Sequence, residues 1–206
     1  MRKFMKSAVL ILAAVTMFAG CSKKSDSNKS MADVVVEKDG KISVKYEEIF
    51  DKDYYTEEDL EKVIDEDVAL FNKENGADSV TKESLKVKKD VALLWYKFAN
   101  SDSYVKYTND FVKPEKEMKL FVGSIKDAED KNIKLGGKFD KVGETGTVTK
   151  NQLENKDELT VFYTNSEMTV YVPGEIVYFN DNVTIDKDVV TTTADKVNYI
   201  LYKAED

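Results

Sequence analysis

The side chains that most often carry out catalysis at neutral pH are scarce in this chain. Its 206 residues include no histidine, one cysteine (Cys21) and one arginine (Arg2). Histidine is the side chain that titrates near neutrality and the commonest metal ligand. Its absence excludes Ser-His and Cys-His catalysis and zinc sites built from His and Cys. Two kinds of catalysis remain, a pair of carboxylates and a Ser-Lys dyad.

Acidic side chains are numerous, with 39 Asp and Glu against 31 Lys and Arg. Pairs of acids two positions apart occur within residues 51–53, 65–67 and 186–188. None of them continues into the Asp-x-Asp-x-Asp-Gly loop that an EF-hand requires. We therefore expect these acids on solvated faces or in turns and predict no metal site.

Glycine-rich stretches do not match a nucleotide-binding loop either. Gly136-Gly137-Lys138 lacks the spaced first glycine and the Ser or Thr of a Walker A loop, and residues 143–146 are too few for a dinucleotide loop. Both stretches are predicted to be turns, and no cofactor is predicted. The net charge of −8 also disfavours nucleic acid as a partner, because an acidic surface repels phosphate backbones.

Cys21 lies at the end of a secretory signal pattern. Basic residues among the first six precede an apolar run, Ala8–Phe18, that is shorter than the roughly 20 residues needed to span a bilayer. The run ends in Phe18-Ala19-Gly20-Cys21, which resembles a bacterial lipobox with Phe18 in place of the usual Leu. The resemblance implies a diacylglycerol on the Cys21 sulfur and cleavage before Cys21. The alternative is an ordinary secretory signal with an incidental cysteine.

The residues after Cys21 predict a division of the chain into four segments. Ser22–Ser30 contains no apolar residue and is typical of a flexible tether. We therefore predict a signal peptide at 1–20, the lipidated Cys21 and its tether at 21–31, an α+β segment at 32–142 and a β-rich segment at 143–206. The last two segments form either separate domains or one compact domain.

Helices and strands are mixed in the α+β segment. Asp39-Gly40 predicts a hairpin between two apolar runs, and Thr56 with Asp59 predicts a capped helix that ends near Gly76. Val91–Phe98 is nearly all apolar and is predicted to be a central strand. The other predictions are a half-buried strand around Leu85 and Val87, a helix over Ser101–Phe111 capped by Ser101 or Asp102, a strand over Met118–Val122 ended by Gly123, a short helix over Ser124–Lys131, and loop around Gly136, Gly137, Gly143 and Gly146.

Strand-like runs separated by turn residues follow from Leu159 to the end of the chain. They are Leu159–Thr164, Met168–Val172, Glu175–Phe179, Val183–Asp186, Val189–Thr193 and Val197–Tyr202. The short spacing predicts an antiparallel meander or small roll. The whole pattern predicts an α+β fold with a β-rich second part.

Two stretches carry a resemblance to a family. Leu120-Phe121-Val122-Gly123 and the segment from Val170 to Tyr178 resemble small lipoproteins of gut Clostridia and relatives. This resemblance implies a cell-surface address and supplies no catalytic residue.

These observations favour a protein held to a membrane on the extracytoplasmic side by lipid on Cys21. We expect a non-enzymatic binding or envelope-surface protein whose ligand is a carbohydrate or a protein. The alternative is a tethered hydrolase that acts on polysaccharide or cell wall. That alternative requires two carboxylates roughly 5–10 Å apart in a cleft with aromatic walls.

Overall fold

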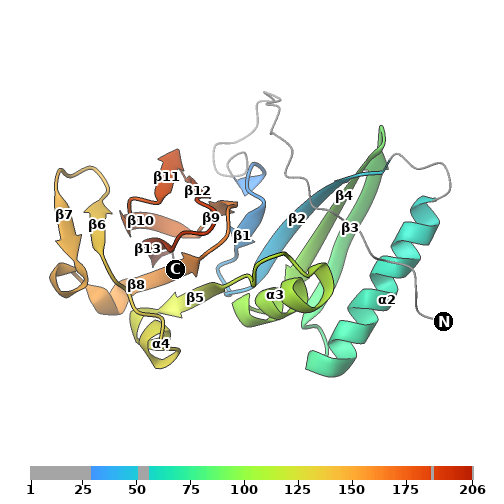
Figure 1. The fold of residues 1–206 in the computed structure, drawn as a ribbon, viewed down its shortest axis with the longest axis horizontal. Helices are drawn as coiled ribbons and strands as arrows, with labels where there is room; N and C mark the ends of the chain where they lie inside the picture. The colour runs from blue at the N-terminus through green and yellow to red at the C-terminus, as the bar shows by residue number, and fades with distance from the viewer. Residues whose placement is uncertain (1–28, 51–55, 187, 206) are drawn as a thin grey trace.

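The structure is a computed structural model that describes residues 29–50, 56–186 and 188–205 (Figure 1). The predicted signal peptide, Cys21, the tether up to residue 28 and the acids at 51–53 lie outside the described residues. The described part folds into two mostly antiparallel sheets with helices, which confirms the predicted α+β class.

Sheet A combines strands from the two ends of the chain. Among the described residues its spatial order is β11 (Val183–Asp186), β12 (Val189–Thr192), β9 (Thr169–Tyr171), β1 (Val34–Val36), β2 (Ile42–Ile49), β4 (Val91–Phe98) and β3 (Val80–Lys88). Strands β1 and β9 run parallel, with Val35 beside Tyr171, and join the late strands to the early ones. The hairpin predicted at Asp39-Gly40 is confirmed, and Gly40 adopts the positive φ of +80° that the turn needs.

Sheet B is built from the middle and the end of the chain. Its order is β5 (Leu120–Ser124), β8 (Leu159–Thr164), β13 (Asn198–Ala204), β10 (Gly174–Phe179), β6 (Lys138–Lys141) and β7 (Thr147–Thr149). The segments 32–142 and 143–206 thus both contribute strands to both sheets. Strand β13 is central, and its side chains from Tyr199 to Tyr202 are buried on both faces.

Three labelled α-helices of the described residues accompany the sheets. They are α2 (Glu57–Asn75), α3 (Ser101–Tyr107), which continues into the π-helix η1 (Thr108–Val112), and α4 (Ile125–Asp130); the 3-10 turns η2 (Lys150–Gln152) and η3 (Lys156–Glu158) precede β8. The predicted capping box of α2 is confirmed, because Thr56 Oγ1 accepts from the Asp59 amide at 3.1 Å and the Asp59 carboxylate accepts from the Thr56 amide. None of the described helices is long and apolar enough to cross a membrane.

Two apolar cores hold these layers together. The larger core lies between the sheets and beneath α2 and α3; it joins Val44, Phe71, Phe98, Tyr107 and Ile200, among others. The smaller core lies on the other face of sheet B, where α4 contributes Ile125 and Ala128. Figure 1 shows α2 beside β3 at one end of the molecule and the β6–β7 hairpin at the other.

Three details differ from the sequence-based expectations. The glycine-rich region predicted as loop contains the β6–β7 hairpin, because Phe139 is fully buried and anchors β6 in the smaller core. Helix α3 is capped by Asn100, whose side chain accepts from the Ser103 amide at 2.9 Å, and not by Ser101 or Asp102. Strand β5 continues past Gly123 to Ser124, because its pairing with β8 extends to that residue.

Asparagine side chains satisfy main-chain groups at several strand ends. The Asn72 amide bonds both the N–H and the C=O of Val80, and Asn109 does the same for Met118. Asn198 is fully buried and makes four such bonds of 2.8–3.2 Å. These bonds supply partners that buried main-chain groups need where the ladders stop.

Candidate functional site

The two faces of sheet A have different surroundings. Val34, Val44, Tyr96 and Phe98 point to the inner face and join the larger core. Alternate residues therefore lie on the opposite, outer face. The register of the strands places these side chains in two adjacent rows that run across the sheet. The first row consists of Tyr171, Val35, Ser43, Lys97 and Thr81. The second row consists of Thr169, Asp33, Lys45, Trp95 and Ser84.

None of the helices α2, α3 and α4 packs on the outer face of sheet A. Helices α2 and α3 pack into the larger core on the inner side, and α4 packs against sheet B. The segment from Lys29 to Ala32 enters the fold beside this face. Ala32 and Val35 are buried, with at most 1% of their surface exposed, so the entry of the chain is part of the packed structure.

An open hollow of about 410 Å³ lies between this segment and the outer face. We call it the Trp95 hollow. It is lined by Lys29, Ser30, Val35, Glu37, Ser43, Glu83, Ser84 and Trp95. Trp95 is the single tryptophan of the chain and is half-buried here.

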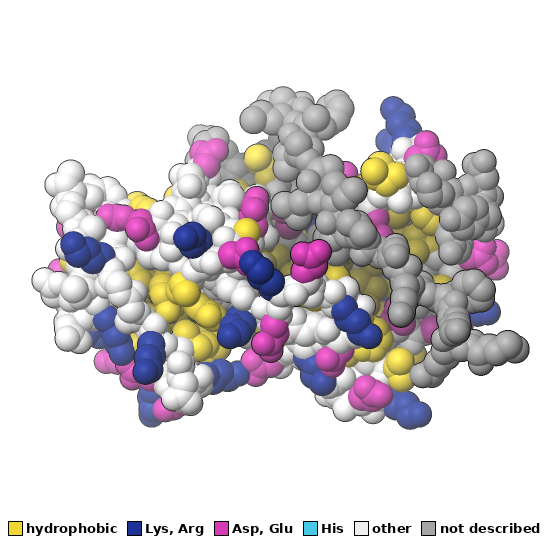
Figure 2. Space-filling model, viewed as in Figure 1, with side chains coloured by type: hydrophobic (Ala, Val, Ile, Leu, Met, Phe, Trp, Pro, Cys, Tyr) yellow, Lys and Arg dark blue, Asp and Glu magenta, His cyan; other side chains and the backbone are white. Residues whose placement is uncertain are grey.

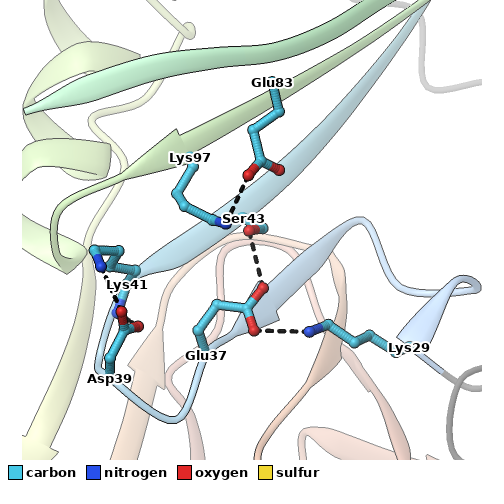
Figure 3. A network of polar contacts seen from close by, with 7 residues as sticks. All are labelled: Lys29, Glu37, Asp39, Lys41, Ser43, Glu83 and Lys97. Atoms are coloured by element: carbon cyan, nitrogen blue, oxygen red, sulfur yellow. Dashed lines mark hydrogen bonds and ion pairs between the residues drawn. The ribbon is translucent and has the colours of Figure 1, made fainter. Parts of the chain in front are cut away.

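Charged and hydroxyl side chains that line the hollow take part in a network of polar contacts, which is drawn in Figure 3. Lys29 Nζ donates to Glu37 at 2.7 Å, and the buried Ser43 hydroxyl donates to the other Glu37 oxygen at 3.0 Å. Across the sheet, Lys97 Nζ lies 2.6 Å from the Glu83 carboxylate. The Glu83 carboxylate raises the pKa of Lys97, which keeps this ammonium charged.

A β-bulge explains why Glu83 meets Lys97. A bulge in β3 between Lys82 and Ser84 interrupts the pairing with β4. The bulge adds Glu83 to the strand, and Glu83 reaches Lys97 on the outer face. Lys82, on the other side of the bulge, instead pairs with Glu61 and Asp65 of α2 at 2.7 Å each.

The Trp95 hollow was not predicted from the sequence. Val91–Phe98 is confirmed as a strand paired on both sides, and such a strand is usually buried on both faces, whereas Trp95 is half-buried at the hollow. Lys97 was the signal that could have corrected this, because it shares a strand face with Leu93 and Trp95 at a spacing of two. Glu37 and Glu83 carry no sequence signature, since only the fold brings them to one hollow.

Of the acids predicted to be solvated, those at 51–53 lie outside the described residues, and Asp67 is half-buried rather than solvated. Asp65 is exposed on α2 and pairs with Lys82, and Asp186 is exposed at the end of β11. Burial, with a smaller contribution from Glu66, raises the pKa of Asp67 above its ordinary value. Within residues 29–50, 56–186 and 188–205, no three Asp, Glu, Cys or His side chains are grouped so that they could hold a metal ion.

The two glycine-rich stretches lie on either side of β6. Residues 143–146 belong to the connection between β6 and β7, as the predicted turn requires, and Gly143 has a φ of +77°. Gly136-Gly137-Lys138 does not form the predicted turn, because it leads directly into β6, which begins at the exposed Lys138.

A second cluster of polar atoms lies within the larger core, where four tyrosines meet. The Tyr107 hydroxyl donates to that of Tyr96 at 3.1 Å, and both rings pack on Phe98. Burial raises the pKa of Tyr96, Tyr104 and Tyr46 well above the ordinary value. These rings fill the core by close contact with one another, so the cluster supports the fold.

Charges over the rest of the surface are balanced at short range. Figure 2 shows lysine and acidic side chains interspersed over the face in view. Many of them form ion pairs, such as Lys116 with Asp195 and Lys131 with Asp102. The Trp95 hollow differs because its paired charges surround an aromatic ring.

Comparison with known proteins gives no further guide. A scan against protein-family models and searches of curated proteins and of solved structures find no match to this chain.

Proposed function

We propose that this protein is a lipid-anchored, extracytoplasmic and non-enzymatic binding protein whose ligand occupies the Trp95 hollow. One observation carries this proposal. The hollow is lined by an aromatic ring, two carboxylates, one ammonium group and serine hydroxyls, and a second ammonium group, that of Lys97, lies 2.6 Å from the Glu83 carboxylate. A few convergent polar groups beside an apolar surface are typical of ligand sites.

The position of Lys29 links this hollow to the proposed anchor. Lys29 lines the hollow, and eight residue steps separate it from Cys21. A fully extended chain spans at most about 3.3–3.6 Å per residue, so lipid on Cys21 holds the hollow within roughly 30 Å of the membrane surface. The ligand is therefore expected among molecules of the envelope close to the membrane.

Binding is favoured over hydrolysis by the pairing of the acids. Glu37 accepts from Lys29 and Ser43, and Glu83 pairs with Lys97. Each acid is thus held as a hydrogen-bond acceptor by a cation of the fold, whereas glycoside hydrolysis by two carboxylates needs one acid placed to donate a proton to the leaving group.

The tethered hydrolase remains the second candidate because Glu37 and Glu83 line the same hollow with Trp95. If it is correct, the purified full chain releases reducing sugar from cell-wall polysaccharide. Glu83→Gln and Glu37→Gln then each abolish the release, while Asp195→Asn, far along the sequence in another ion pair, leaves it unchanged.

The anchor is tested by labelling cells with palmitate. Wild-type protein is expected to take up label and to sediment with membranes, whereas Cys21→Ala takes up none. A wild-type chain without label would contradict the lipid anchor. Ligand binding in the Trp95 hollow is tested by a separate experiment.

The binding site is tested by sedimentation of the full chain, purified in detergent, with isolated cell-wall fragments. We expect Trp95→Ala to reduce the bound fraction and Leu70→Ala, an exposed apolar residue of α2, to leave it unchanged. Thermal unfolding of both variants shows whether each remains folded. Equal binding by folded Trp95→Ala and wild type would contradict the proposed site.

A further inference from the structure

We infer that the ligand of the Trp95 hollow is a saccharide, an inference that rests on the proposed binding function. The hollow combines one aromatic surface with side-chain groups that hydrogen-bond to hydroxyls. Sugar rings present both features, since one face carries C–H groups and the edge carries hydroxyls.

Trp95 supplies the apolar part of this site. It lies on a β-sheet face between Lys45 on β2 and Ser84 on β3, so neighbouring strands hold its position. An indole ring offers a large apolar area with little conformational freedom to lose on binding. Stacking a pyranose on this ring would remove C–H and aromatic surface from water together.

The polar groups supply the hydroxyl recognition. Each ionised carboxylate has about four acceptor positions, and the named bonds to Lys29, Ser43 and Lys97 leave some of them for a ligand. The lysines donate and Glu37 and Glu83 accept, so the hollow offers both partners that a hydroxyl uses. Two cations facing two anions also leave the hollow close to neutral, which suits an uncharged glycan better than a phosphate or a nucleic acid.

An extended peptide is less well matched to this hollow. Peptides often bind by adding a strand at a sheet edge, where main-chain groups are unpaired. The Trp95 hollow instead lies over the face of β1, β2, β4 and the edge strand β3, and Trp95 itself is on β4, whose main-chain groups pair with strands on both sides. Recognition must therefore come from side chains.

The single tryptophan makes the inference directly testable, because its fluorescence reports on the hollow alone. The full chain in detergent is titrated with three probes: a tetramer of N-acetylglucosamine, a tetramer of glucose and a tetra-alanine peptide. We expect at least one saccharide to change the Trp95 emission with saturation and the peptide to cause no change. Calorimetry should then show that Trp95→Ala weakens binding of that saccharide by about tenfold or more.

Two further variants test whether the Ser43 hydroxyl contributes to saccharide binding. Ser43→Ala removes the hydroxyl that donates to Glu37 and should weaken saccharide binding. Thr191→Ala changes a residue of β12, in the same sheet but outside the hollow, and should leave binding unchanged. A response to the peptide alone would overturn the saccharide inference and keep the hollow as a binding site. Saccharide binding that folded Trp95→Ala retains in full would overturn both.

Discussion

Lys29 and Glu37 form a 2.7 Å ion pair that joins the entering segment of the chain to the residue just after β1. The Glu37 carboxylate also accepts from Ser43 on β2, so the pair is part of the outer face of sheet A. The contact places the start of the described fold at the wall of the Trp95 hollow. In the sequence, eight residue steps separate Lys29 in this wall from the proposed anchor at Cys21.

Removing this ion pair should change the surroundings of Trp95 clearly and the free energy of unfolding only slightly. Lys29→Met is expected to alter the free energy of unfolding by less than about 1 kcal/mol, because both side chains are partly exposed to water. It should nevertheless shift the Trp95 emission, since Lys29 and Trp95 line one hollow. The matched control is Lys116→Met, which breaks another exposed pair and should leave the emission unchanged. Identical spectra for Lys29→Met and wild type would contradict the arrangement.

Asn198 should be among the most sensitive polar positions of the fold. Asn198→Ala removes the amide that bonds the carbonyls of Thr164, Thr193 and Lys196 in a fully buried position. Leaving buried groups unpaired costs about 1–3 kcal/mol each, so we expect a loss of roughly 2–4 kcal/mol in urea unfolding. Asn151→Ala, at an exposed position, is the control and should cost less than about 0.5 kcal/mol. Equal midpoints for the two variants would show that Asn198 does not support β13.

Local signals in the sequence predicted the elements better than their arrangement. Thr56 with Asp59, and Asp39-Gly40, act on neighbouring residues, and the structure confirms both. The parallel contact of β1 with β9 joins Val35 to Tyr171 across most of the chain, and no local pattern specifies such a partner. The distribution of strands between two sheets was not predictable for the same reason.

For the candidate site too, the sequence shows the residues but does not show how the fold arranges them. The residue types in the hollow were visible in the sequence, but their meeting depends on the pairing of β1, β2, β4 and β3 and on the bulge before Ser84. Acids that are paired within the sequence, such as Asp65 and Asp67, can be recognised without the fold. The acids that the fold brings to one hollow, Glu37 and Glu83, are far apart in the chain.

Replacing the two residues of the β3–β4 turn by those that type I′ turns prefer should stabilise the protein. Lys89 and Asp90 form the two-residue loop with φ of +50° and +62°, as in a type I′ turn, where Asn-Gly is preferred. Non-glycine residues in this region cost roughly 1–2 kcal/mol each. Replacing the pair by Asn-Gly should therefore raise the free energy of unfolding by about 1 kcal/mol or more. A lower urea midpoint for this variant would contradict the turn geometry.

Alkaline pH should unfold the protein through its buried tyrosines. Burial raises the pKa of Tyr46, Tyr96, Tyr104 and Tyr107 in the folded state. A raised pKa gives stability that is fully present below the unfolded value of about 10 and is lost as the pH rises above it. Tyrosinate absorbance from these residues should thus appear together with the loss of circular dichroism. Complete ionisation of all 11 tyrosines near pH 10 with the dichroism intact would contradict the buried cluster.

Amide NMR of the full chain in detergent, with cell-wall saccharide added in steps, maps the residues that a bound ligand contacts. We expect the largest shifts on residues of the outer face of sheet A, namely Val35, Ser43, Ser84 and Trp95. The amides of α4 and of the β6–β7 hairpin should hardly change. Shifts confined to sheet B or to the exposed face of α2, with the Trp95 hollow unaffected, would contradict the central claim.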